Sequence, residues 1–306
     1  MVEIKRMQAR DRLTNPIQGR VKWSVSKSLW YSGHVCIAVV GVVLTWSLEN
    51  VVLAGLLTVG TLACGHSVGI HRLLIHRSFQ CPYWLEVCLV YLGCLVGMGG
   101  PFKMLYLHDI RDWSQRHTSC HPYFTHQSGI WRDWWWQNHC QIELSHPPRF
   151  RVEEDVSKSR LYQWMDRYWM LLQIPLAIIL YCFLGPEALI WGISVRIAVS
   201  LTGHWFVGYV THNGGDQDWF LSRHAVQGYN SRFFGLLAMG EGWHNNHHAF
   251  PESARLGHDH TQPDPGWWFI LLLSRLGLAW HITLPHHIPK RAELKKIAHK
   301  LSEITE

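Results

Sequence analysis

Three histidines stand within five residues of one another in the stretch "GEGWHNNHHAFP", residues 240 to 251. His244, His247 and His248 have the spacing i, i+3, i+4, which places all three side chains on one face of a helix. Crowded imidazoles gain little from one another, but neutral imidazole is a common ligand for metal ions. We therefore interpret the stretch as one wall of a metal site.

Two further pairs of histidines have spacings that suit metal binding. In "HTSCH" His117 and His121 stand four residues apart, the spacing of neighbours on a helix face. In "HRLLIH" His71 and His76 stand five residues apart, and on an ideal α-helix their side chains would point about 140° apart. Both would face one site only if the helix bends or if metals lie on two sides of it.

An eighth histidine, His204, lies near the end of a later apolar segment. One metal with an open position typically takes three protein ligands, so eight imidazoles suffice for two metals. Histidine is as abundant as carboxylate in this chain, at 22 residues each, and none of the 8 cysteines forms a CxxC pair. Because imidazole suits iron, zinc and copper, the residues favour a histidine-held pair of irons over a thiolate cluster. The cysteines are expected to be reduced, without a disulfide framework.

Long apolar segments must position these histidines. They predict four transmembrane helices in two hairpins, because each is close to the roughly 20 residues that a bilayer requires once flanking residues are counted. The first hairpin comprises residues 35–47 and 51–65, and the second comprises residues 168–185 and 188–210. Two shorter apolar runs, 83–100 and 266–280, are predicted to be interfacial or half-buried helices.

Charge predicts the orientation of the hairpins. Seven lysines and arginines precede the first hairpin, whereas its outer turn carries only Glu49 and the outer turn of the second carries only Glu187. By the positive-inside rule, both termini and residues 66–165 are expected in the cytoplasm. The histidine clusters then lie on one cytoplasmic face, close to helix ends.

The predicted organisation has three parts. A basic cytoplasmic segment spans residues 1–29, the membrane domain spans 30–285, and a charged segment spans 286–306. The ends, residues 1 to about 28 and 288 to 306, are predicted to be peripheral helices or frayed segments. The net charge of +6 comes without any nucleic-acid-binding signature, so no nucleic-acid partner is expected.

The order of the histidine motifs resembles that of the membrane fatty acid desaturases. The first motif is "HRLLIH", a middle box follows near residues 117–121, and the last is "GEGWHNNHHAFP", similar to the pattern HxxxxH, HxxHH, HxxHH of the acyl-CoA type. The resemblance covers roughly residues 30–285. It implies four transmembrane helices under a cytosolic helical cap. It also implies a non-haem di-iron centre that uses O₂ and two electrons to remove two hydrogens from an acyl chain.

The resemblance also implies a ligand set. Carried over by position, the iron ligands are His71, His76, His117, His121, His204, His244, His247 and His248. The middle box departs from the family pattern, because Cys120 stands where its second histidine is expected, and Cys120, His108 or His126 are the candidates to complete it. Ser200 stands where the family tends to have a water-holding asparagine.

Polar residues around the last motif have two interpretations. Glu241, Asn245 and Asn246 either orient the imidazoles, as supporting residues commonly do in metal sites, or simply begin a polar helix.

The sequence thus predicts an integral-membrane, O₂-dependent fatty acyl desaturase acting on an acyl-CoA, an acyl-carrier or an acyl-lipid. A di-iron lipid hydroxylase is the alternative enzyme, and a non-catalytic, desaturase-like lipid-binding protein is the alternative of another class. The expected partners are an acyl-chain substrate and membrane lipid. A separate electron-donor protein is also expected, because the chain has no haem-binding motif of a fused cytochrome domain.

Overall fold

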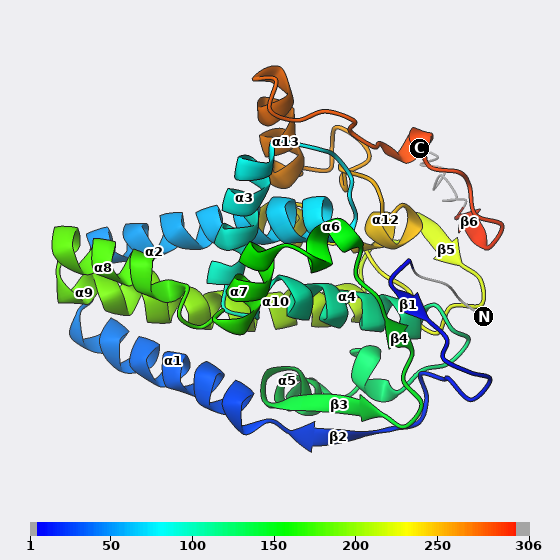
Figure 1. The fold of residues 1–306 in the computed structure, drawn as a ribbon, viewed down its shortest axis with the longest axis horizontal. Coiled ribbons are helices and arrows are strands. Elements are labelled where there is room, and N and C mark those ends of the chain that lie inside the picture. Colours follow the sequence, from blue (N-terminus) through cyan, green and yellow to red (C-terminus); the bar gives the residue numbers. More distant parts are fainter. Residues whose placement is uncertain (1–4, 298–306) are drawn as a thin grey trace, which may run out of the picture.

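The computed structural model describes residues 5–297 and consists mainly of helices (Figure 1). Residues 1–4 of the predicted N-terminal segment and 298–306 of the predicted C-terminal segment lie outside the described residues. The longer helices are α1 (Val25–Leu44), α2 (Leu48–Gly60), the π-helix η1 (Thr61–Ile75), α3 (Tyr83–Leu95), α4 (Pro101–Gln115), α5 (Ile130–His139), α7 (Arg160–Arg167), α8 (Gln173–Leu184), α10 (Arg196–Asn213) and α13 (Pro265–Arg275). The short ones are η2 (Pro122–Phe124), α6 (Glu154–Ser157), α9 (Pro186–Leu189), η3 (Ile190–Val195), α11 (Arg232–Leu237), α12 (His244–Ala249) and η4 (Pro285–His287).

Three helices in the described part are long and apolar enough to cross a membrane. They are Val25–Leu44, Leu48–Ile75, in which α2 runs into η1, and Pro186–Asn213, in which α9 and η3 run into α10. The predicted span 168–185 is represented by α8, an apolar helix of 12 residues. Twelve residues rise about 18 Å, less than the roughly 30 Å of a hydrocarbon core. The fold is therefore mostly helical with three candidate spans, and the predicted fourth depends on a shorter helix.

The turns of the two predicted hairpins lie at the same end of the molecule, at the left of Figure 1. Ser47 begins α2 by accepting a hydrogen bond from the Asn50 N–H. Gly185 separates α8 from α9 with φ 85°, a backbone conformation that glycine adopts without steric cost. Asn50 also donates a hydrogen bond to Glu187 at 3.1 Å, which joins the two turns.

The π-helix η1 explains how two histidines five residues apart face the same side. A π-helix closes its hydrogen bonds between residues i and i+5, so side chains at this spacing lie nearly over one another. The His76 N–H donates to the His71 carbonyl at 3.0 Å, and the two ring centroids are 4.8 Å apart. The helix widens here, which removes the 140° divergence expected of an α-helix without a bend.

Glycines bring η1 against α3 at backbone distance. A Cβ added at Gly65 would lie 2.4 Å from the backbone nitrogen of Gly93, and one added at Gly69 would lie 2.4 Å from the Leu89 carbonyl oxygen. No side chain fits in such a gap, so only glycine permits this approach. The contact fixes the position of η1 along α3, and with it the positions of His71 and His76.

Six short strands form three two-stranded antiparallel sheets within the described part. The pairs are β1 (Met7–Gln8) with β4 (Arg149–Phe150), β2 (Gly19–Trp23) with β3 (Cys140–Leu144), and β5 (Trp219–Leu221) with β6 (Leu294–Lys296). They gather at the right of Figure 1, opposite the hairpin turns. The described parts of the end segments therefore contain strands that pair with strands from the middle of the chain. The prediction of peripheral helices or frayed ends was wrong for these strands. No local pattern indicates a strand whose partner is as distant in the sequence as Phe150 is from Met7 or Lys296 is from Trp219.

Candidate metal centre

The first histidine cluster joins imidazoles from η1 and the residue that follows it, from α4 and from α12. Its members are His71, His76, His108 and His247. Their potential ligand nitrogens all lie within 4.8 Å of one another, and the Nε2 atoms of His76 and His108 are 3.3 Å apart. His71 and His247 are only 6% and 3% exposed, so the cluster is largely shielded from water.

The second histidine cluster joins α10 to α12. Its members are His212, His244 and His248, and their potential ligand nitrogens also lie within 4.8 Å of one another. The Nε2 atom of His244 is 3.2 Å from that of His212 and 3.0 Å from that of His248.

The donor atoms fit metal ions. Imidazole nitrogens that share one metal at about 2.1 Å lie about 3.0 to 3.4 Å apart, depending on the angle between them. The three Nε2 pairs at 3.0, 3.2 and 3.3 Å have such separations. In addition, the buried Nδ1 of His247 has no hydrogen-bond partner among the described residues. Purely imidazole donors suit iron, zinc or copper.

Burial keeps four of these imidazoles neutral. Together with the neighbouring imidazoles it lowers the pKa of His76, His244 and His247 well below the ordinary value. Burial likewise lowers the pKa of His248 to about 4. Neutral imidazole is the form that binds a metal, so these four imidazoles do not have to lose a proton at neutral pH. At His108 the effect of burial is outweighed by the carboxylates of Asp112 and Asp109, which raise its pKa.

Helix α12 connects the two clusters. His244 and His248, one turn apart, belong to the second cluster, whereas His247 lies against His71, with ring centroids 4.6 Å apart. The last histidine motif thus contributes imidazoles to both clusters.

Two of the clustered imidazoles are hydrogen-bonded at Nδ1, His108 to Asp109 Oδ1 at 3.1 Å and His212 to the Gly208 carbonyl oxygen at 2.7 Å. His71 Nδ1 lies at ion-pair distance, 2.8 Å, from Glu241 Oε2. An acceptor at Nδ1 keeps the proton on that nitrogen and leaves Nε2 free for a metal, as is usual in histidine metal sites.

Glu241 supports the first cluster, as one of the two interpretations of the sequence expected. Ser67 donates a hydrogen bond to its carboxylate at 2.6 Å, and Arg72 lies 3.9 Å away. Burial alone would raise the pKa of Glu241, but His71, Arg72 and Ser67 hold it below its usual range. The carboxylate is therefore ionised beside His71.

Asn245 and Asn246 contact loops and not imidazoles. The Asn245 side chain accepts from the Asp218 and Trp219 N–H groups, and the Asn246 side chain donates to the Leu256 carbonyl at 2.8 Å. Both are 1% exposed. They position α12 as a whole.

Three histidines of the predicted ligand set lie outside both clusters. Nδ1 of His117 is 2.7 Å from the Trp113 carbonyl oxygen, Nδ1 of His121 accepts from the Tyr123 N–H, and the ring of His204 contacts that of His66. Helix α4 ends at Gln115, so His117 and His121 lie in a loop, where a spacing of four residues places nothing on a common face. The other five predicted residues are all in the clusters.

Two clustered histidines were not in the predicted set. His108 was only an alternative for the middle box, although its position four residues before Asp112 marked it as a helix neighbour of a carboxylate. His212 was missed because the predicted span 188–210 ends before it, whereas α10 continues to Asn213. The last turn of α10 therefore carries His212, and His204 lies two turns earlier.

The other candidates for the middle box have different surroundings. Burial raises the pKa of the Cys120 thiol to about 11, so it is protonated at neutral pH, and thiolate is the form that binds metal. Both ring nitrogens of His126 are engaged, Nδ1 by Asp133 at 2.9 Å and Nε2 by Arg111 at 2.6 Å. Neither residue belongs to a cluster.

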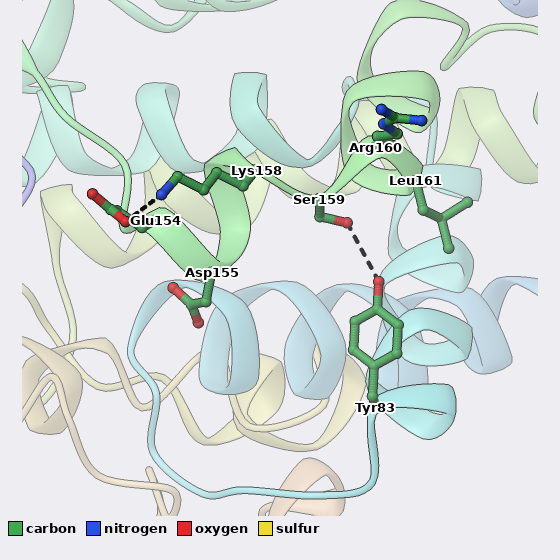
Figure 2. Close-up of a pocket in the computed structure, with 7 residues that line it drawn as sticks. All are labelled: Tyr83, Glu154, Asp155, Lys158, Ser159, Arg160 and Leu161. Atoms are coloured by element: carbon green, nitrogen blue, oxygen red, sulfur yellow. Dashed lines mark hydrogen bonds and ion pairs between the residues drawn. The ribbon is translucent and has the colours of Figure 1, made fainter.

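A surface pocket beside α6 and α7 is not part of this centre (Figure 2). No histidine lines it. Several of its charged and polar groups are paired: Lys158 with Glu154, Asp155 with Arg77 at 2.8 Å, and the Ser159 and Tyr83 hydroxyls, which are 3.3 Å apart.

The fold and the site together define a helical, membrane-associated protein with two buried histidine clusters fit for metal. A sequence model of the fatty acid desaturase family matches residues 48–262. The chain is 34% identical over 224 residues to the sn-1 stearoyl-lipid 9-desaturase of Anabaena variabilis, covering 72% of this chain and 79% of that protein. It is 36% identical over 245 residues to the enzyme of the same name from Synechocystis sp., covering 78% and 74%. It is 32% identical over 231 residues to the acyl-CoA C20 Delta5-desaturase of Anemone leveillei, covering 74% and 72%.

The chain belongs to the fatty acid desaturase family. The predicted family is thereby confirmed, and so is the prediction of an oxidoreductase.

Proposed function

We propose that this protein is an O₂-dependent fatty acyl desaturase with a di-iron centre. The observation that carries the proposal is the pair of imidazole clusters joined by α12, each with nitrogens at separations suited to one metal. His71, His76, His108 and His247 would hold one iron, and His212, His244 and His248 would hold the other. The irons supply the activation of O₂.

The reaction balance explains the expected electron donor. Conversion of a CH₂–CH₂ pair to a CH=CH pair releases two hydrogens with two electrons, while reduction of O₂ to two waters consumes four electrons and four protons. Two further electrons and two protons must therefore enter. We assign the electrons to a separate donor protein.

The substrate is an acyl chain. The relatives include proteins named for acyl-lipids and for acyl-CoA, so both carriers are compatible with the family. The chain's own contribution is to hold the acyl segment beside the clusters and away from water, because correct placement alone removes much of a reaction barrier.

The centre is proposed to lie on the cytoplasmic side of the membrane, in a cap above four spans. The hairpin turns lie at one end of the molecule and the sheets at the other (Figure 1). The turns carry Glu49 and Glu187 and no basic residue, which favours the non-cytoplasmic side for them. Large apolar side chains on α1, α2 and α8 are exposed, for example Val43 at 77%, Leu48 at 76% and Phe183 at 80%, as expected of a surface that faces lipid.

Metal analysis of the purified full-length protein tests the proposal. We expect iron in both clusters of the wild type, and near-complete loss from the first cluster in His247→Ala. The matched control is His117→Ala, which removes a histidine outside both clusters and should retain wild-type iron. An iron content far below one ion per chain, in protein from iron-supplied cells, would refute the proposed enzymatic function and favour a non-catalytic lipid-binding protein.

Analysis of membrane fatty acids identifies the reaction. Cells that express the protein together with an electron donor are expected to gain fatty acids lighter by two hydrogens, and His247→Ala cells are not. A gain of one oxygen atom would instead assign the protein as a lipid hydroxylase.

A further inference from the structure

A two-stranded sheet covers the helix that contributes imidazoles to both clusters. Its strands, β5 and β6, pair in the register Trp219 with Lys296, Phe220 with Lys295 and Leu221 with Leu294. Successive side chains of a strand point to opposite faces. Leu221 is 1% exposed, so the face that it shares with Trp219 is turned inward. Phe220, 42% exposed, lies on the outer face with Lys295.

The inner face of this sheet contacts α12 directly. The Trp219 N–H donates to Asn245 Oδ1 at 2.8 Å, and the Asn245 side chain donates back to the Trp219 carbonyl oxygen at 2.8 Å. The ring of Trp219 is 5.0 Å from that of Phe250, the residue that follows α12. Asn245 is the chain neighbour of His244. One layer of sheet therefore separates the surface from the helix that carries His244 and His248.

The segment that leads into β6 is anchored to the same helix. Arg291 donates hydrogen bonds to the carbonyl oxygens of His248 at 2.6 Å and of Ala249 at 2.9 Å. The Ser222 N–H and hydroxyl both donate to the Glu293 carbonyl oxygen at 3.0 Å, which joins the loop after β5 to the segment before β6. The sheet and its flanking loops thus form one surface over α12.

This surface, which we call the β5–β6 face, is basic. It comprises residues 219–227 and 288–297, whose cationic side chains are Arg223, Lys290, Arg291, Lys295 and Lys296. All of these except Arg291 are exposed. Glu293 is the one carboxylate in the same residues, and it lies 3.9 Å from Arg291. Even with Asp216 and Asp218, which come just before β5, the charge balance stays positive.

The position of the β5–β6 face suits a soluble partner. It lies at the end of the molecule opposite the hairpin turns (Figure 1), so it is turned away from the proposed membrane spans. The proposed reaction needs two electrons from outside the chain, and their donor must dock close to the clusters, because electron tunnelling weakens steeply with distance. A basic surface attracts an acidic partner and accelerates its encounter.

We propose that the β5–β6 face is the docking surface for the electron donor, a soluble one-electron redox protein with an acidic face. This inference rests on the proposed function, because it takes the histidine clusters as the electron acceptor. Each docked donor is oxidised by one electron. Two dockings therefore supply the two electrons that, with two protons from water, complete the reduction of O₂ to two waters. The docked donor faces α12, which contributes imidazoles to both clusters.

Anaerobic mixing of the oxidised, iron-loaded, full-length protein in detergent with a reduced plant-type [2Fe–2S] ferredoxin, an acidic one-electron carrier, tests the proposal. The visible absorbance of ferredoxin reports its oxidation. We expect a second-order reaction that slows as salt is added, since salt screens exposed charges. Arg223→Glu/Lys295→Glu reverses two charges of the face and should lower the rate constant about 10-fold or more at low salt, because like charges then oppose docking.

The matched control is Arg149→Glu/Arg151→Glu, which reverses two exposed arginines at β4, in a different sheet. It changes the net charge equally and should slow the reaction far less. If it slows the reaction as much as Arg223→Glu/Lys295→Glu does, the donor does not dock on the β5–β6 face, and the proposal is overturned. Iron content separates a docking defect from a folding defect. Should Arg223→Glu/Lys295→Glu lack iron, Lys290→Glu/Lys295→Glu takes its place.

The remaining outcomes separate this inference from the proposed function. An iron-loaded wild type that oxidises no ferredoxin, or a rate constant that Arg223→Glu/Lys295→Glu leaves unchanged, refutes only this inference. Anionic lipid is the other occupant of a basic face: if the variant reacts like the wild type but loses thermal stabilisation by phosphatidylglycerol, the face contacts lipid and the proposal is overturned. A wild type without iron would refute the proposed function itself.

Discussion

At the scale of single residues, carboxylates determine which imidazole nitrogen each histidine offers. Glu241 lies at Nδ1 of His71, and Asp109 lies at Nδ1 of His108. Both carboxylates are themselves fixed, Glu241 by Ser67 at 2.6 Å and Asp109 by Arg6 at 3.1 Å. The geometry of the first cluster therefore depends on residues that need not touch a metal.

Glu241→Gln is expected to lower the metal affinity of the first cluster by about 10- to 100-fold, the usual cost of losing such a support. The amide can no longer stabilise the positive charge that develops on His71 when it binds a metal. Fe²⁺ or Zn²⁺ titration of the metal-free protein measures the effect, with Glu252→Gln, an exposed carboxylate after α12, as the control. Equal affinities in the two variants would show that Glu241 does not orient His71.

The sequence predicted clustered histidines where their spacing within one helix was sufficient to place them. The last motif and "HRLLIH" supplied five clustered histidines, because both lie on helices that the sequence pattern indicated. His212 and His108 required a helix end and a helix register that the pattern left undefined. Pairing by spacing failed for His117 and His121, since these residues lie in a loop between α4 and η2.

At the scale of elements, the π-helix η1 is the feature on which the first cluster depends. Its residues Ile70 and Leu74 are fully buried in a core with Val90 and Cys94 of α3. The sequence showed an apolar segment but not this helix type, because the wide hydrogen-bond pattern is selected by packing against α3, a contact between segments. π-Helices are rare, occur mostly as single turns within α-helices, and frequently lie at functional sites.

Gly69→Ala is expected to disturb the centre through this packing. The new Cβ would lie 2.4 Å from the Leu89 carbonyl oxygen, so η1 must move and carry His71 with it. Overpacking of this kind typically costs about 1–3 kcal/mol. Thermal unfolding in detergent and metal content should both fall. Gly55→Ala, on α2 with no atom within 4 Å of the added Cβ, is the matched control and should be neutral or slightly stabilising.

At the scale of the whole molecule, the N-terminal segment packs against the end of η1 that carries the first histidine cluster. Arg6 is 3% exposed and donates to Glu153 at 2.6 Å and to the Ile75 carbonyl oxygen at 3.0 Å. It thereby ties residues that are widely separated in the sequence to the end of η1. Such contacts have no local signature, which is why the strands and this buried arginine could not be predicted from the sequence.

Stability of the metal-free protein is expected to fall as the pH drops from about 6.5 to about 4. Burial lowers the pKa of four imidazoles outside the candidate spans to about 4, namely His126, His224, His248 and His258. In the unfolded chain they titrate near 6.5. Between these values the unfolded state binds more protons than the folded state. Each group therefore costs up to about 1.4 kcal/mol per pH unit as the pH falls, and above pH 6.5 its contribution is constant.

Thermal unfolding of the metal-free protein at several pH values checks this expectation. The buried carboxylates Asp133 and Glu241 do not contribute to this change in Tm. Their pKa values are lowered, so their contribution to the stability of the fold is lost only as the pH falls below the ordinary carboxylate pKa, near 4. The Tm should be level from pH 7.5 to 6.5 and should then fall steadily toward pH 4.5. His224→Gln removes one of the titrating imidazoles outside the clusters, so its Tm should fall less steeply than that of the wild type over the same interval. A Tm that stays level down to pH 5 would mean that the folded protein takes up as many protons as the unfolded chain over this interval, and the lowered pKa values of these imidazoles would be contradicted.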